Sequence, residues 1–301
     1  MLPQTMVLTY YMHSGFSCAV GDTLLVFDYW RGEHDELPDA ARITAEQLRG
    51  FKKVYVFISH SHPDHFDPIV YSWREEAPVT YIVSHELPVG TRGKRMYPGD
   101  TLSFEDGLTV SAYDSTDLGV SFLVDVAGIR VFHAGDLNFW HWREESTLAE
   151  IEEAETAFRT AVAPLERLSR EPDGTIDVAF FPVDPRQGSL FDAGANYFIM
   201  SCKPRLMIPM HFWERAEIAV EFARRGRTRE TEIIAMTRPG ENVVLEFDAE
   251  GFMTVNLPPA PIYEPQQVDP SVHDGPDPFV DTDLPVTLDE NEQTEENTEE
   301  Q

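Results

Sequence analysis

Residues 54–67, VYVFISHSHPDHFD, join a strand-like run to a dense group of metal-binding side chains. The run VYVFI is rich in β-branched and aromatic residues, as is typical of a buried strand. His60, His62, Asp64 and His65 then follow within six positions. α/β proteins place binding and catalytic residues on loops at strand ends. The segment therefore favours an α/β fold in which this loop carries the chemistry.

The spacing of these side chains favours a metal site over hydrogen-bonded core histidines. His60 and His62 stand at i and i+2 of an extended segment, so they project to the same side and can bind one ion. Asp64 and His65 lie beyond a turn at Pro63 and can point toward a second position. A purely structural role is the weaker explanation, because each group would need its own hydrogen-bond partner in a crowded loop.

The charge of the chain disfavours nucleic acid as a partner. The 301 residues include 53 Asp and Glu against 23 Lys and Arg, a formal net charge of −30. Residues 258–301 contain thirteen of these acidic residues and no Lys or Arg, and we expect this Pro-rich, acidic tail to be disordered. Residues 1–257 alone carry a formal charge of about −17, which still repels the phosphate backbone of a nucleic acid. We expect a small-molecule substrate, and homo-oligomerisation is left open.

The two cysteines, Cys18 and Cys202, do not suggest a disulfide framework and fit a reducing compartment. The first residues lack the basic segment and apolar run of a signal peptide. No apolar run reaches the roughly 18 residues that a membrane-spanning helix needs. The expected location is cytoplasmic, without membrane association.

Strand patterns fill the first half of residues 1–257, and the second half mixes strands with helices. Strands are expected within 5–11, 23–30, 53–59, 79–84, 100–115, 119–136, 176–183, 205–212, 242–247 and 252–257. Helices are expected after Asp67 and within 144–170, 193–202 and 216–225. In the longest helix, apolar residues recur every three or four positions, which predicts one buried face. The pattern indicates one α/β domain with more than one sheet.

The motif HSHPDH resembles the H-x-H-x-D-H motif of the metallo-β-lactamase superfamily at all four positions. VFHAGD resembles the segment whose aspartate bridges two metals, here Asp136, and IPMHF resembles the segment of the last metal-binding histidine, here His211. YYMHSGFSCAV and LLVFDYW resemble the opening strands of the ascorbate-6-phosphate-lactonase-like branch. The resemblance covers about residues 6–257 and implies a four-layer αββα sandwich.

The resemblance also implies a metal-dependent hydrolase with two divalent ions, zinc first and manganese or iron as alternatives. A hydroxide held between the ions would attack a small ester, lactone or phosphorylated metabolite. Asp64 would bind the second ion, orient the hydroxide and carry a proton toward the leaving group. The alternatives are a phosphodiesterase or nuclease on the same dinuclear site, and a non-catalytic metal-binding sensor domain.

The chain departs from the family pattern at one position. The family usually places another histidine between the motif and the bridging aspartate, and here that interval reads TVSAYDSTDLG. We expect Asp117 to take this place, with Asp114 as a weaker candidate or Ser115 beside an open, water-filled position. A carboxylate would make the site more favourable to Mn²⁺ or Fe²⁺. Alternatively, Asp117 only turns the chain before Gly119.

Three further residues are expected near the substrate. His13 lies in the opening segment and is expected to bind substrate or support a metal ligand, with a structural hydrogen bond as the alternative. Trp140 and His141 follow the bridging aspartate on a loop expected to border the pocket and bind substrate. His141 could instead complete the ligand set of a metal, or both residues only cover a helix end. His133, on an apolar strand, is expected to be packed and hydrogen-bonded.

Overall fold

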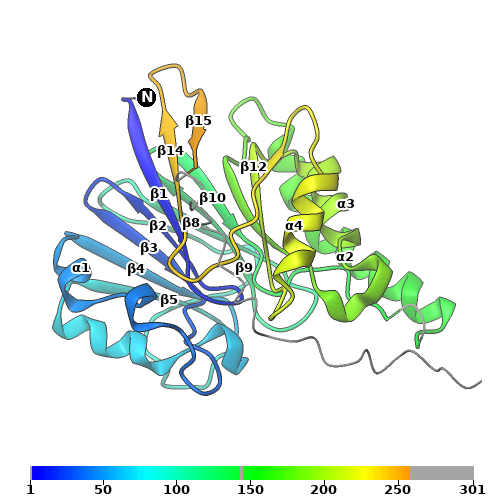
Figure 1. The fold of residues 1–301 in the computed structure, drawn as a ribbon, viewed down its shortest axis with the longest axis horizontal. Coiled ribbons are helices and arrows are strands. Elements are labelled where there is room, and N and C mark those ends of the chain that lie inside the picture. The colour runs from blue at the N-terminus through cyan, green and yellow to red at the C-terminus, as the bar shows by residue number, and fades with distance from the viewer. Residues whose placement is uncertain (1, 143–144, 258–301) are drawn as a thin grey trace, which may run out of the picture. The chain divides into compact units, whose positions relative to one another are not determined.

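The structure of the chain, a computed structural model, describes residues 2–142 and 145–257. Two β-sheets pack face to face, and helices lie on the outer face of each (Figure 1). The predicted four-layer αββα sandwich is therefore confirmed. The predicted tail at 258–301 lies outside the described residues, so the domain boundary near residue 257 stays a prediction.

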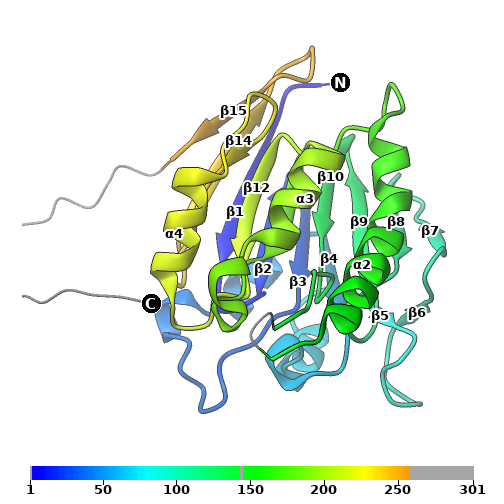
Figure 2. The ribbon, with the colours of Figure 1, turned by 90° about the vertical axis from the view of Figure 1, so that its right-hand side faces the viewer.

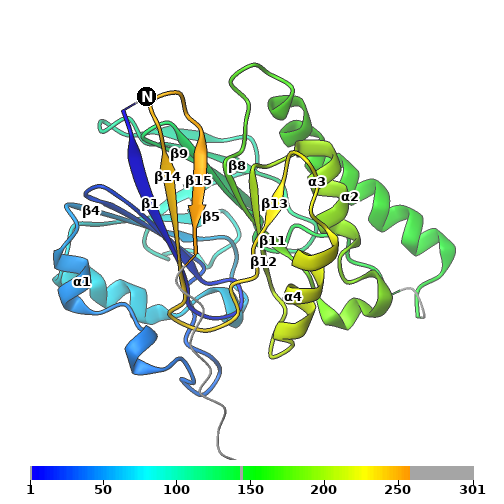
Figure 3. The same cartoon turned by 45° about the horizontal axis from the view of Figure 1, so that its top comes forward.

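The first sheet has eight strands and contains the histidine-rich motif at the end of one of them. Their order is β15 (Met253–Asn256), β14 (Asn242–Phe247), β1 (Gln4–Tyr10), β2 (Phe16–Val20), β3 (Thr23–Phe27), β4 (Lys53–Ile58), β5 (Val79–Ser84) and β6 (Lys94–Met96). The strands from β15 to β3 pair antiparallel, and those from β3 to β6 pair parallel. Figure 3 shows β14 and β15 beside β1, closing this sheet with the end of the described chain.

The second sheet has seven strands. Their order is β13 (Glu232–Ile233), β12 (Leu206–Met210), β11 (Val178–Pro182), β10 (Ile129–His133), β9 (Ser121–Val126), β8 (Thr109–Tyr113) and β7 (Thr101–Ser103). The strands from β7 to β10 pair antiparallel, and those from β10 to β13 pair parallel. The predicted hairpin within 119–136 is β9 and β10, joined at Ala127 and Gly128, which both have positive φ.

The helices cover the outer faces of the sheets. α1 (Ala45–Arg49) lies on the eight-stranded sheet, and α2 (Leu148–Ser169), α3 (Ala193–Cys202) and α4 (Ala216–Arg225) lie on the seven-stranded sheet (Figure 2). The described residues also include four 3₁₀ helices: Asp39–Ala41, Pro63–His65, Pro68–Glu75 and Pro185–Leu190. Within the two described ranges, no helix combines the length and apolarity needed to cross a bilayer.

Two of the expected helices differ in detail from the sequence prediction. The helix expected over 144–170 begins at Leu148, because Thr147 and Glu150 form a capping box that fixes its first turn. The segment after Asp67 is a 3₁₀ helix, with the Asp67 side chain accepting a hydrogen bond from the backbone N–H of Ile69. The helices expected at 193–202 and 216–225 have the predicted bounds.

Aromatic side chains between the sheets hold the two halves of the fold together. Phe16 of β2 stacks on Phe180 of β11 with ring centroids 4.3 Å apart, and Phe57 of β4 contacts Phe122 of β9 at 5.5 Å. All four are fully buried. Each such pair contributes about 0.5–1.5 kcal/mol beyond the burial of its area. The contacts fix the loops of one sheet relative to those of the other.

Gly119 lets the loop before β9 approach the motif closely. Its φ is +77°, and a Cβ there would collide with the carbonyl oxygen of Ser59 and lie 2.7 Å from His60 Cβ. We expect Gly119→Ala to lower the free energy of unfolding by at least about 2 kcal/mol, measured by urea unfolding. Gly107→Ala is the control, because Gly107 also has positive φ (+86°) but has open space around a Cβ. Equal losses in the two variants would contradict the steric explanation.

Candidate metal centre

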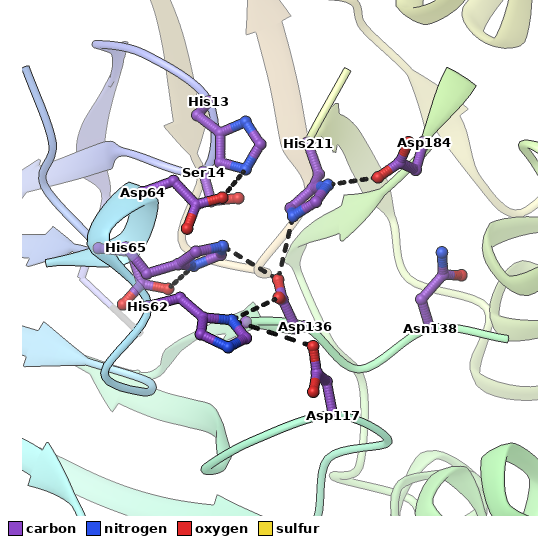
Figure 4. Close-up of polar contacts among 12 residues, drawn as sticks. His13, Ser14, His62, Asp64, His65, Asp117, Asp136, Asn138, Asp184 and His211 are labelled. Carbon is purple, nitrogen blue, oxygen red and sulfur yellow. Dashed lines mark hydrogen bonds and ion pairs between the residues drawn. The ribbon is translucent and has the colours of Figure 1, made fainter. Parts of the chain in front are cut away.

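The parallel strands of both sheets deliver polar residues to one place. Asp28 follows β3, His60 follows β4, Asp136 follows β10, Asp184 follows β11 and His211 follows β12. Carboxyl ends of parallel strands are where α/β folds place ligand sites. Figure 4 shows side chains from these loops converging from the two sheets.

Asp136 lies between two groups of histidines and offers one oxygen to each. Its Oδ2 is 3.3 Å from His60 Nε2 and 3.9 Å from His62 Nδ1. Its Oδ1 is 3.0 Å from His65 Nε2 and 3.3 Å from His211 Nε2 (Figure 4). A buried carboxylate in this arrangement can share its two oxygens between two adjacent metal ions.

The first group consists of His60, His62 and Asp136, whose ligand atoms lie within 4.8 Å of one another. His60 Nε2 is 3.0 Å from His62 Nδ1, so both nitrogens face the same point. Asp117 Oδ2 lies 4.0 Å from His62 Nδ1, and its side chain is 43 % exposed. Asp117 is therefore at the open side of the group, within reach of an ion bound there.

Asp114 is exposed, and its carboxylate accepts a hydrogen bond from the N–H of Ser115.

The second group consists of His13, Asp64, His65 and His211, again with ligand atoms within 4.8 Å. The sequence prediction placed His13 with the substrate or behind a ligand. In the structure its Nε2 lies 3.2 Å from Asp64 Oδ2, and its ring centroid is 4.0 Å from that of His211. His13 is thus positioned as a potential ligand of the second ion.

The buried atoms of this centre fit metal ions. His13 Nε2, His65 Nε2, His211 Nε2 and Asp136 Oδ1 are buried and have no hydrogen-bond partner among the described residues. Buried polar atoms are normally hydrogen-bonded, so a convergent set without partners requires an explanation. Imidazole nitrogens and carboxylate oxygens are ligands for zinc, manganese and iron, and the donor set fits such an ion.

Two carboxylates behind the centre orient the histidines that face it. Asp28 Oδ2 lies 2.8 Å from His65 Nδ1, and Asp184 Oδ2 lies 2.9 Å from His211 Nδ1. A hydrogen bond from Nδ1 leaves Nε2 free to bind a metal and makes it a better ligand. Arg186 also binds Asp184, through Nε and Nη2. The sequence analysis missed both aspartates, although each directly follows a strand or comes within two residues of one.

The histidines and aspartates of the centre strongly shift one another's pKa values. Burial raises the pKa of Asp136, but the charges of His65 and His211 outweigh burial and hold this pKa well below its ordinary range. Burial lowers the pKa of His65, but Asp136 and Asp28 raise it well above its ordinary value. Burial and the nearby His211 lower the pKa of His13 to about 3. His13 is therefore neutral and able to bind metal near pH 7, whereas an ion must displace a proton at His65.

Backbone strain is concentrated at the centre. His13, Asp28, His211 and Trp213 have φ values of 55°, 41°, 64° and 52°. They are four of the seven non-glycine residues with positive φ in the described ranges. Such conformations cost about 1–3 kcal/mol each and occur mainly where surrounding structure enforces them, often at functional sites.

The remaining predicted residues lie at different distances from the centre. Trp140 donates a hydrogen bond from Nε1 to the carbonyl oxygen of Asp136, at 2.7 Å, and its ring centroid is 5.6 Å from that of His211. His141 is buried and stacks on Phe139, and its Nδ1 is 3.2 Å from the Phe139 carbonyl oxygen. Trp140 therefore borders the centre, whereas the contacts of His141 are those of a packed residue.

His133 is packed and hydrogen-bonded, as predicted. Its side chain is fully buried and Nε2 donates to the carbonyl oxygen of Ser14 at 2.8 Å. Its ring also stacks on Phe27. His133 thus supports the strand end from which Asp136 projects.

No protein-family model matches the chain, and no curated protein matches it at a significant level. Solved structures do match. Igni18, a metallo hydrolase from the archaeon Ignicoccus hospitalis, has a TM-score of 0.59 and 22 % identity over 81 % of this chain and all of that one. A protein of Parabacteroides distasonis assigned as a metal-dependent hydrolase has a TM-score of 0.52 and 18 % identity over 78 % and 94 % of the two chains.

The metallo-β-lactamase fold protein YhfI from Bacillus subtilis has a TM-score of 0.50 and 12 % identity over 85 % of this chain and all of that one. At these identities the likeness concerns the fold, and the ascorbate-6-phosphate-lactonase-like branch stays a prediction. The strand order, the helical layers and these structures together show that the chain adopts the metallo-β-lactamase fold.

Proposed function

We propose that the chain is a metal-dependent hydrolase of a small ester, lactone or phosphorylated metabolite. One observation carries the proposal: the two oxygens of Asp136 face two groups of histidine and aspartate side chains, each of which could hold an ion. His60 and His62 would hold the first ion together with Asp136. Asp64, His65, His211 and His13 are the candidates for the second.

Two adjacent divalent ions would lower the pKa of a shared water to near neutrality and polarise a carbonyl or phosphoryl oxygen of the substrate. The chain's own contribution is to hold the ligands in fixed geometry. Asp28 and Asp184 fix the rings of His65 and His211, and Trp140 fixes the backbone of Asp136. Little rearrangement is then needed at the moment of reaction.

Asp64 is the proposed catalytic carboxylate. Burial raises its pKa, but the close approach of His13, with Nε2 3.2 Å from Oδ2, and the charges of neighbouring histidines outweigh burial, and the net pKa is lowered. Asp64 is therefore ionised near pH 7 and is a better ligand and orienting group than proton donor. Passing a proton to the leaving group would require Asp64 to gain one from the reacting water first.

The first position offers fewer imidazoles (His60 and His62) than the second (His13, His65 and His211), so the two positions would not bind the same metal equally well. Asp117, at 4.0 Å from His62, is the proposed additional ligand. A site with two carboxylates and two imidazoles is compatible with Zn²⁺ and also suits Mn²⁺ and Fe²⁺. Zinc remains the first expectation, with manganese and iron as alternatives.

The test is reconstitution of the full chain with Zn²⁺, Mn²⁺ or Fe²⁺, followed by metal analysis and a screen of lactones, aryl esters, phosphomonoesters and phosphodiesters. We expect bound metal and hydrolysis of at least one class. Asp64→Asn should lower kcat by at least about 100-fold, within the range for loss of a positioned proton-transfer or orienting group. Asp173→Asn, at an exposed aspartate just after α2, should leave activity unchanged.

Absence of bound metal together with absence of hydrolysis under all three reconstitutions would overturn the proposal. Metal binding without hydrolysis would instead favour the metal-binding sensor. Hydrolysis restricted to RNA or DNA would favour the nuclease alternative, against the negative charge of the chain. The cytoplasmic location and the oligomeric state stay predictions.

A further inference from the structure

A cavity beside the metal centre carries groups that the proposed hydrolysis does not use. The cavity has a volume of about 300 Å³. It is lined by, among others, His13, Trp30, Trp213, Glu33, Glu36 and Glu214. His13 joins the cavity to the centre, because it lines the cavity and its Nε2 lies 3.2 Å from Asp64. A group bound here would be one side chain away from the candidate metal ligands.

Two tryptophans contact the ring of the histidine and form aromatic walls of the cavity. The ring centroid of Trp213 is 4.5 Å from that of His13, and the centroid of Trp30 is 5.8 Å from it. Arg186 places its guanidinium carbon 5.0 Å from the Trp213 ring centroid, so this indole already binds one cation. Indole faces are the aromatic surfaces that attract cations most strongly. The walls therefore suit a cation that also has apolar substituents.

Three glutamates give the cavity a negative charge that the protein does not balance. In the described part of the chain, Glu33, Glu36 and Glu214 form no ion pair with a lysine, arginine or histidine, and no lysine or arginine lines the cavity. The adjacent Arg31 is bound to Asp67, with Nε 2.6 Å from Oδ2. Unpaired carboxylates beside aromatic walls favour a cationic ligand over an anionic one.

Contacts within the loop 32–36 hold the carboxylate of Glu36 in place. Glu36 Oε2 accepts a hydrogen bond from the backbone N–H of His34 at 3.0 Å. Gly32 has a φ of +93°, and a Cβ there would collide with the same carboxylate. Glycine at this position therefore lets Glu36 fold across the loop toward the cavity.

His13 provides the independent indication of a ligand. Its side chain is almost completely buried, and Nδ1 has no hydrogen-bond partner among the described residues. Nδ1 lies on the side of the ring away from Asp64 (Figure 4). Trp213 Nε1 is also buried without a partner. Buried polar atoms without partners in a cavity wall indicate a bound water or ligand.

We propose that this cavity binds an alkylammonium group of the substrate, while the bond to be hydrolysed lies at the metal centre. Trp30 and Trp213 would contact the alkyl substituents, and the three glutamates would balance the charge. This inference rests on the proposed function and narrows its substrate to cationic esters, lactones or phosphoryl compounds.

The test compares choline with its uncharged isostere 3,3-dimethyl-1-butanol, using calorimetric binding to the metal-loaded full chain at physiological ionic strength. We expect choline to bind at least about tenfold more tightly than the isostere. The variant Glu33→Gln/Glu36→Gln/Glu214→Gln should lose about tenfold or more in choline affinity and keep its metal content. The control Glu152→Gln/Glu153→Gln/Glu171→Gln removes the same charge from exposed positions on or just after α2 and should bind choline as the unaltered chain does.

Equal binding of choline and the isostere, or equal losses in the two triple variants, would overturn the inference. The outcome is separable from that of the hydrolysis screen. Hydrolysis of uncharged esters without choline discrimination would reject the cavity assignment and leave the proposed function standing. Choline discrimination without any hydrolysis would reject the proposed function and leave a cation-binding cavity.

Discussion

Replacing Asp136 with Asn should abolish binding of both proposed ions. The carboxylate of Asp136 lies within 4 Å of ring nitrogens of His60, His62, His65 and His211. The substitution keeps the volume but removes the charge that both ions would share. Loss of groups behind metal ligands costs 10–100-fold in affinity, and loss of a shared ligand should cost more than about 100-fold. Metal analysis after reconstitution and dialysis measures this loss, and hydrolysis should fall with it.

The control is Asp173→Asn, which removes the same charge from an exposed turn after α2 and should leave metal content unchanged. Two further outcomes are informative. If Asp136→Asn keeps one tightly bound ion, the two groups are independent sites and the carboxylate does not bridge them. If the variant keeps both ions with unchanged affinity, the arrangement of oxygens around Asp136 has been misinterpreted.

The sequence was sufficient to predict the layers of the fold and to propose most of the residues that the structure brings together at the candidate centre. Strand-like runs ending in polar residues predicted β4 with His60 and β12 with His211, because a short apolar run and the polar residues at its end are local properties of the sequence. The fold itself came from the resemblance of the motifs. The spacing of apolar runs alone indicated only an α/β domain with more than one sheet.

The supporting carboxylates could not be predicted, because their partners are distant in sequence. Asp28 is 37 residues from His65, and Asp184 is 27 residues from His211. Nothing local distinguishes an aspartate that orients a histidine from one that turns the chain. The signal that was available is position: both aspartates lie just after buried parallel strands, in the loops that also supply metal ligands.

His13 shows a different limit of sequence analysis. A lone histidine in the opening segment carries no spacing information, so its proximity to a cleft was expected only from resemblance. In the structure both His13 and His211 have a left-handed backbone conformation, and the centroids of their rings lie 4.0 Å apart. The same ring faces the candidate metal ligands with Nε2 and lines the cavity. Its predicted role with the substrate and its position beside Asp64 are therefore compatible.

Asp28 connects the stability of the fold to the geometry of the centre. It is fully buried and accepts hydrogen bonds from the Ser59 N–H at 2.8 Å, from Ser59 Oγ at 2.5 Å and from His65 Nδ1 at 2.8 Å. Burial raises its pKa, but the hydrogen bond from His65 and the charges of three histidines outweigh burial and lower it. Asp28 is therefore ionised near pH 7 and balances a buried imidazolium when no metal is bound.

We expect Asp28→Asn to lower the free energy of unfolding of the metal-free chain by about 3–5 kcal/mol at neutral pH, the range for removing one partner of a buried ion pair. Metal affinity should also fall about 10–100-fold, because the ring of His65 loses its orienting acceptor. Asp106→Ala is the control. Asp106 accepts hydrogen bonds from Tyr55 and pairs with Lys53, but it reaches solvent, so its loss should cost only about 1 kcal/mol.

The pH dependence distinguishes this charge effect from a packing defect. The contribution of Asp28 is present above its ordinary pKa of 3.8 and is lost as the pH falls through the lower pKa of the folded state. The contribution of His65 is present below its ordinary pKa of 6.5 and is lost as the pH rises through the raised folded-state pKa. The difference between the unaltered chain and Asp28→Asn should therefore be largest between these limits and shrink on both sides. Urea unfolding in the presence of a chelator measures it, and a difference that is constant with pH would mean that Asp28 acts through packing alone.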